Sequence, residues 1–122
     1  MDFSFTPEQV EVSKLAATIF GDGCTPDRLK AVDDAAQEGG ARFDRALWES
    51  ISDAGLTGVA LPEEYGGSGL GVLEMCSVLV EAGRTVAPLP LATHVPVAMT
   101  IARFGTPDQA AAWVSPASAG AI

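Results

Sequence analysis

The side chains that could carry out chemistry are few and widely spaced in this sequence. His94 is the only histidine, so no group of histidines can bind a metal ion. Cys24 and Cys76 lie far apart and form no C-x-x-C pair. Glu63 and Glu64 are adjacent, and adjacent residues do not share a site as an acid and a base must, so we expect both to be solvated. The residues alone therefore point to no catalytic side chain and no metal site, and we expect His94 to be structural or exposed.

A glycine-rich segment, Gly67-Ser68-Gly69-Leu70-Gly71, invites comparison with loops that bind nucleotide phosphates. The dinucleotide pattern G-x-G-x-x-G requires a preceding strand and a glycine at position 72, where the chain has Val72. The lysine of a Walker loop is also missing. The glycines instead predict unusual backbone angles or a close approach to a neighbouring segment.

The charge of the chain is strongly acidic and unevenly distributed. The 122 residues carry a formal net charge of −9, which disfavours both a nucleic-acid partner and docking on an anionic membrane surface. Residues 65–122 contain only five charged side chains, namely Glu74, Glu81, Asp108, Arg84 and Arg103. An ordinary wet surface is about 25% charged, so we expect a second body to cover part of this half.

No segment predicts export or membrane insertion. The N-terminal residues have no basic region before an apolar stretch, as a signal peptide would. The longest uncharged stretch, 85–102, is interrupted by three prolines and His94, which argues against a spanning helix. Two isolated cysteines are typical of a reduced, cytoplasmic protein.

The periodicity of apolar residues predicts an all-α domain, an up-down bundle of five to six helices. Thr6, Pro7 and Gln9 form a capping box that opens the first helix, which we expect Gly21 and Gly23 to end. Further helices are expected from Pro26 to Gly39, from Asp44 to Gly55, over 72–82, from a Thr93 cap to Gly105, and from Pro107 to Trp113 or Val114. The prolines between Thr85 and Leu91 predict an extended connection, and Val59-Ala60-Leu61 is the only candidate strand.

The same pattern predicts which faces are buried. Helix 72–82 is apolar nearly all round, with Leu73, Cys76, Leu79, Val80 and Gly83 on one side and Met75 and Val78 on another, so we expect it to be central. In the fifth helix we expect Val97, Ile101 and Phe104 to face inward. Glu81 and Arg84 are three residues apart and can pair, either on the surface or as a brace under the following loop.

Several segments together resemble the N-terminal helical domain of the acyl-CoA dehydrogenases. Leu47-Trp48 and Ala54-Gly55-Leu56 are similar to the family's "lW…l…Gl" helix end, and Pro62 to Gly69 resembles its P-E-x-x-G-G-x-G loop. Glu81-Ala82-Gly83-Arg84 followed by Ala87-Pro88-Leu89-Pro90 is similar to actinobacterial members that often act on bulky, sterol-derived or branched acyl-CoAs. The resemblance runs from residue 3 to residue 120.

The resemblance implies a helical domain of an FAD-dependent enzyme that removes hydrogens from the α and β carbons of an acyl-CoA thioester. The family follows this domain with a β domain and a four-helix bundle, which carry most of the FAD contacts and the catalytic glutamate. Residues 1–114 would form the helical domain and 115–122 the tail where the β domain would begin. None of Glu63, Glu64, Glu74 or Glu81 matches the family's base, and we do not expect this chain alone to hold FAD.

By position, the resemblance implies that the fifth helix supplies one wall of the acyl pocket. The side chains concerned would be Ala92, Thr93, Val95, Pro96 and Met99. Family members commonly form dimers or tetramers and some are heteromeric, so the implied partners are acyl-CoA and further acyl-CoA dehydrogenase subunits.

Two other functions remain open from the sequence. The chain could be a non-catalytic helical interaction module, or the complementing subunit of a heteromeric dehydrogenase. A carrier of acyl or CoA groups is disfavoured, because Arg84 and Arg103 are the only cations in the second half to bind the CoA phosphates.

Overall fold

The computed structural model describes residues 1–122 and contains six α-helices and no strand. The helices are α1 (Pro7–Gly23), α2 (Pro26–Gln37), α3 (Arg45–Asp53), α4 (Val72–Arg84), α5 (Leu91–Phe104) and α6 (Pro107–Ser118), with short 3₁₀ turns η1 (Leu56–Gly58) and η2 (Glu63–Tyr65) between α3 and α4. The all-α prediction is confirmed, and the candidate strand at Val59–Leu61 is wrong because these residues follow η1 as a turn.

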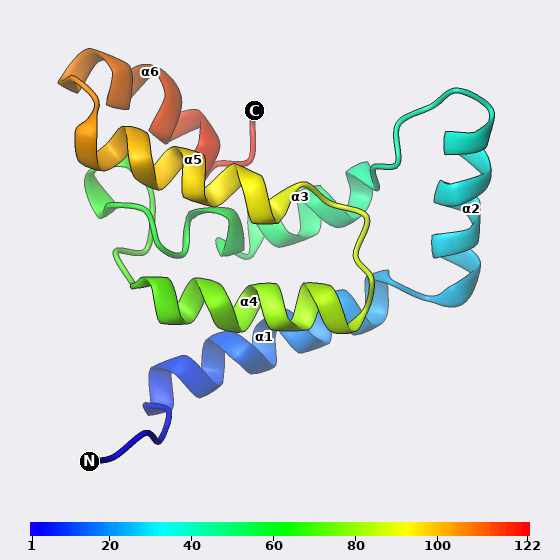
Figure 1. Ribbon diagram of the computed structural model, residues 1–122, viewed down its shortest axis with the longest axis horizontal. Helices are drawn as coiled ribbons and strands as arrows, with labels where there is room; N and C mark the ends of the chain where they lie inside the picture. The colour runs from blue at the N-terminus through cyan, green and yellow to red at the C-terminus, as the bar shows by residue number, and fades with distance from the viewer.

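The helices pack as two pairs joined through α3. Figure 1 shows α1 and α4 side by side on one side of the molecule, and α5 and α6 on the other. The larger core lies among α1, α3, α4 and the start of α5, around fully buried Phe20, Ile51 and Val78. A smaller core, including Leu61 and Val114, holds α6 against α5.

Capping residues fix where the helices begin. The capping box at Thr6 and Gln9 is present, with Gln9 N donating to Thr6 Oγ1 over 3.2 Å, and Thr106 with Gln109 repeats it before α6. The first turns of α1 and α4 are joined where Gln9 Nε2 donates to Glu74 Oε1 over 3.1 Å, so these two helices run in the same direction. The caps at Thr6 and Thr106 were predicted from the sequence, whereas the contact between Gln9 and Glu74 was not.

Two helix boundaries differ from the sequence-based expectation. α1 ends at Gly23, one of the two glycines expected to end it, and Phe20 in its last turn is fully buried in the core. α5 begins at Leu91, before Thr93, so Pro96 lies inside the helix and not in its first turn. α6 extends to Ser118, well beyond Val114, with Ala117 and Ser118 buried.

Side chains from three elements hold the extended end of α6. Trp48 Nε1 donates to Gly120 O (2.8 Å), and Thr57 Oγ1 donates to Ser118 O (2.8 Å). His94 Nε2 donates to Ala117 O over 3.0 Å. The last carbonyls of a helix have no partner within the helix, so these bonds stabilise the final turn that periodicity alone did not predict.

The faces of α4 and α5 are also assigned differently by the structure. Met75, Val78 and Glu81 face the core from α4, whereas Leu73, Cys76 and Val80 are exposed, so the helix is not central. In α5 the inward stripe is Leu91, Val95 and Ala98, and the expected inward residues Val97 and Phe104 are 59% and 76% exposed. Each helix carries two apolar stripes, of which one faces the core and the other is mostly exposed; Ile101 is the exception in α5, because it is half-buried against the smaller core, as expected.

The connection from α4 to α5 opens with a tight turn and not with extended chain. Val86 has a φ of 55°, a left-handed conformation usually taken by glycine. Val86 N bonds Gly83 O (3.2 Å) and Ala87 N bonds Ala82 O (2.9 Å), the two bonds of a Schellman motif. These two backbone hydrogen bonds hold Val86 at a positive φ, although β-branched residues prefer a negative φ.

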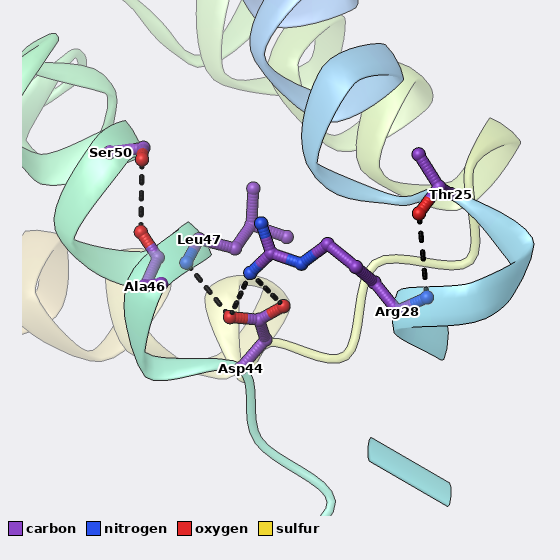
Figure 2. Close-up of polar contacts among 6 residues, drawn as sticks. All are labelled: Thr25, Arg28, Asp44, Ala46, Leu47 and Ser50. Carbon is purple, nitrogen blue, oxygen red and sulfur yellow. Dashed lines mark hydrogen bonds and ion pairs between the residues drawn. The ribbon is translucent and has the colours of Figure 1, made fainter. Parts of the chain in front are cut away.

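α2 stands apart from the bundle and buries no residue (Figure 1). Arg28 links α2 to the start of α3, because its Nη2 lies 2.9 and 2.7 Å from the two carboxylate oxygens of Asp44 (Figure 2). Asp44 Oδ1 also accepts from Leu47 N (2.9 Å) as the N-cap of α3. One buried carboxylate therefore both starts α3 and anchors α2.

Replacing Asp44 should separate these two roles. We expect Asp44→Ala to lower the free energy of unfolding by about 2 kcal/mol, because the cap is lost along with the charge-assisted bonds to Arg28. Asp44→Asn keeps a capping oxygen and should cost only about 1 kcal/mol, and Arg28→Ala less than about 1 kcal/mol because Arg28 is half exposed. Urea unfolding of the three variants measures this order, and equal losses for Asp44→Asn and Asp44→Ala would contradict the capping role.

Candidate functional site

Most of the residues expected to form the wall of the acyl pocket lie on the outer face of α5. Ala92, Thr93 and Pro96 are exposed and adjacent on the helix, and Met99, one turn further along, is half-buried and touches both cores. Val95 points the other way and is fully buried in the larger core. The structure therefore brings together Ala92, Thr93 and Pro96, with Met99 at their edge, and separates Val95 from them.

This face carries little charge and one backbone irregularity. Arg103 is the only charged residue of α5. Proline has no N–H, so Pro96 leaves the carbonyl of Ala92 without its usual bond within the helix. Pro96 O still accepts from Thr100 Oγ1 over 2.8 Å. A smooth, uncharged helix face with small side chains at Ala92 and Thr93 is suited to lie against an apolar group.

Beside this face, a groove of about 340 Å³ runs between α5 and α6. Its lining is Pro90, Thr93, His94, Val97, Ala98 and Ile101 from α5 and the residue before it, with Trp113, Ala117 and Ile122. This groove was not predicted from the sequence, because Val97 was expected in the core and Ile122 in a featureless tail. The signal available was the apolar pair Val97 and Trp113 in a half of the chain that is short of charge.

His94 has a structural contact within this lining. Besides its bond to Ala117 O, the imidazole meets the Trp48 ring edge-on with centroids 4.8 Å apart. No group of three or more His, Cys, Asp or Glu side chains is placed to hold a metal ion. His94 thus links α3, α5 and α6, in keeping with its expected structural role.

The glycine-rich loop has no free amides for a phosphate. The N–H groups of Gly67, Ser68, Gly69 and Leu70 donate to the carbonyls of Pro62, Gly58, Leu61 and Val59, with lengths of 2.9–3.1 Å. Gly66 and Gly69 have φ values of 85° and 66°. A phosphate-binding loop needs amides that point at the ligand, so this loop serves as a brace that folds back on η1.

The carboxylates do not form an acid–base site. Glu63 and Glu64 are exposed, as expected. The backbone amide of Glu74 itself, with smaller help from Gln9 and Gly71, holds the pKa of Glu74 below its ordinary value, so this group is an acceptor. Glu81 is buried, with Arg84 Nη2 3.5 Å away, so the pair is a brace at the end of α4.

No helix in this chain combines the length and the apolar character that crossing a membrane requires. Cys24 and Cys76 are both free thiols.

Comparison with known proteins identifies the fold and the family. The family model described as "Acyl-CoA dehydrogenase, N-terminal domain" matches residues 6–121. Acyl-CoA dehydrogenase FadE27 of Mycobacterium tuberculosis is 40% identical over 114 residues, which are 93% of this chain and 30% of that protein. The chain thus spans less than a third of the length of this relative.

Two solved structures agree with this match. The ChsE4-ChsE5 complex from Mycobacterium tuberculosis contains a chain 38% identical to this one, with a TM-score of 0.90 over 98% of this chain and 32% of that chain. A variant of the Tcur3481-Tcur3483 steroid ACAD is 41% identical, with a TM-score of 0.83 over 93% of this chain and 30% of that chain. Fold, sequence and family model agree over almost all of the chain, which belongs to the acyl-CoA dehydrogenase family and forms its N-terminal domain.

Proposed function

We propose that this chain forms one wall of the acyl site of an FAD-dependent acyl-CoA dehydrogenase, which introduces a double bond between the α and β carbons of an acyl-CoA thioester. The observation that carries the proposal is the exposed, uncharged face of α5 made by Ala92, Thr93 and Pro96, in a chain of this family. The role of this wall is to position the acyl group and exclude water from it.

The flavin and the catalytic base do not belong to this wall. Flavin in this family accepts the hydride. The loop amides at Gly67–Leu70 are already bonded within the chain, and Arg84 and Arg103 are the only cations in the second half, so these residues do not fit a flavin diphosphate. We therefore assign the FAD contacts and the base to the part of the full-length relatives that this chain does not match.

The substrate class follows from the size of the wall residues. Ala92 and Thr93 are small and leave room beside the helix, which suits a bulky, sterol-derived or branched acyl group better than a thin straight chain. The description of one matched structure as a steroid ACAD supports this choice. Two unpaired cysteines favour a reducing, cytoplasmic location.

The partners are further acyl-CoA dehydrogenase subunits, since both matched proteins, the ChsE4-ChsE5 complex and Tcur3481-Tcur3483, pair two components. A second candidate function is a non-catalytic complementing subunit or interaction module. The exposed apolar face of α4, with Leu73, Cys76 and Val80, favours it, because that face could contact a subunit without touching substrate.

A domain exchange tests the proposal. Residues 6–121 replace the matching domain of the ChsE4-ChsE5 complex subunit that they resemble, and the exchanged subunit is co-expressed with its partner. We expect the complex to assemble, to keep the FAD content of the parent and to oxidise acyl-CoA within about tenfold of the parent rate, which corresponds to a barrier change below about 1.4 kcal/mol. The parent complex lacking this domain is the control.

An exchanged complex that assembles with full FAD but does not oxidise acyl-CoA would contradict the proposal and favour the non-catalytic module.

A further inference from the structure

The groove between α5 and α6 has a chemistry of its own, apart from the acyl wall. Its lining contains no Asp, Glu, Lys or Arg, and its sides are formed mainly by Val97, Ile101 and Trp113. At about 340 Å³ it lies at the small end of the range for ligand sites. An occupant that suits these walls is uncharged, mostly apolar and about the size of one substituted ring.

His94 adds an imidazole to this lining, and its hydrogen bond to Ala117 O determines which ring nitrogen carries the hydrogen. The Ala117 carbonyl can only accept, so Nε2 of His94, 3.0 Å away, carries the hydrogen. In the neutral imidazole Nδ1 is then an acceptor, and no donor of the chain bonds to it. The edge-on contact with Trp48 keeps the ring in place. The groove thus combines apolar walls with two acceptors, the unbonded Nδ1 of His94 and the hydroxyl oxygen of Thr93, which donates to Pro90 O and can also accept.

We propose that this groove binds a small uncharged ring alcohol, such as a phenol or an alicyclic alcohol, whose hydroxyl donates to Nδ1 of His94. The ring packs against Val97, Ile101 and Trp113. The acyl wall shares only Thr93 with the groove, so the two sites can be tested separately.

The test uses the full 122-residue chain and two probes of the same shape, 4-ethylphenol and 4-ethyltoluene. Binding is followed by NMR through the indole N–H signals, with Trp113 reporting on the groove and Trp48, bonded to Gly120 O, on the integrity of the fold. We expect both probes to shift the Trp113 signal, with 4-ethylphenol about fivefold tighter because it gains one hydrogen bond. Only 4-ethylphenol should move the Nδ1 nitrogen signal of His94, which is the single histidine.

Two variants and one control locate the site. His94→Gln keeps an N–H donor for Ala117 O and replaces the Nδ1 acceptor by an amide oxygen at a different position, so it should weaken the fivefold preference and still bind 4-ethyltoluene. Val97→Glu places a charge in the groove and should abolish binding of both probes, whereas Leu73→Glu on the outer face of α4 should change neither.

Equal affinity of the unmodified chain for the two probes would overturn the proposal, as would the absence of any Trp113 shift. Self-association that Val97→Glu abolishes would also overturn it, because the groove would then be a contact between protein molecules. If His94→Gln loses the Trp48 signal and is unfolded, the proposal is tested by the unmodified chain alone, through its relative affinity for 4-ethylphenol and 4-ethyltoluene.

Discussion

Gly67→Ala is expected to destabilise the chain by about 3 kcal/mol, more than the usual cost of a surface substitution. A Cβ at position 67 would overlap the carbonyl oxygen of Leu61 and come within 2.8 Å of Gly58 O. Both are backbone atoms that cannot rotate away, and both carbonyls accept bonds from the loop itself. Chemical denaturation of the variant, compared with the unmodified chain, measures the loss.

Gly83→Ala is the matched control for this change. Gly83 lies inside α4, and a Cβ there meets nothing within 4 Å. Alanine has the higher helix propensity, so this variant should gain about 0.5–1 kcal/mol. If Gly67→Ala proved as stable as Gly83→Ala, the loop could not be the tight brace against residues 58–62 described above.

The sequence predicted the role of this loop in part. The density of glycines indicated left-handed backbone or close approach, and both occur, the first at Gly66 and Gly69 and the second at Gly67. The partner of the close approach, the turn at residues 58–62, could not be predicted because it depends on how η1 and η2 fold against each other. The glycine content predicted that the backbone of this loop would be close to another segment, but only the folded structure identifies that segment as residues 58–62.

Most helix starts were predictable for the same reason, since a cap is a contact between residues three apart; the exception is α5, which begins at Leu91 and not after the expected Thr93 cap. Thr6, Asp44 and Thr106 each accept the bond that their side chain and position indicated. The end of α6 was not predictable, because the bonds that Trp48 and His94 make to it come from residues distant in the chain.

The inward faces of α4 and α5 show the limit of periodicity. In α5, both Leu91–Val95–Ala98 and Val97–Ile101–Phe104 have helical spacing, and nothing local to the helix distinguishes them. The structure buries the first stripe and leaves Val97 and Phe104 exposed. The shortage of charge in residues 65–122 had indicated that some apolar surface there would be uncovered, without saying which.

The residues of the candidate site were also predicted only in part. Ala92, Thr93 and Pro96 follow from the family resemblance and do lie together on the surface, while Val95, assigned to the same wall, belongs to the core. Position along a helix is transferable between relatives, but a shift of one residue turns a side chain by about 100° around a helix of 3.6 residues per turn.

The second large effect is expected from Ala92→Trp, introduced into the exchanged complex that carries residues 6–121. Ala92 is exposed in this chain, so the larger side chain can be accommodated without unfolding it, but it would occupy the space proposed for the acyl group. We expect kcat/KM for a bulky acyl-CoA to fall about 100-fold, the scale of a misplaced reacting group, while the FAD content stays unchanged. A short straight-chain acyl-CoA should lose much less, so the preference between the two substrates should change.

Leu73→Trp is the control, because Leu73 is also exposed but lies on the outer face of α4. The most direct measurement of the acyl wall is therefore the ratio of kcat/KM for a bulky and a short acyl-CoA in these two variants. The wall predicts that Ala92→Trp lowers this ratio strongly and that Leu73→Trp leaves it unchanged. Equal ratios in the two variants, with FAD bound in both, would contradict the placement of the acyl group against α5.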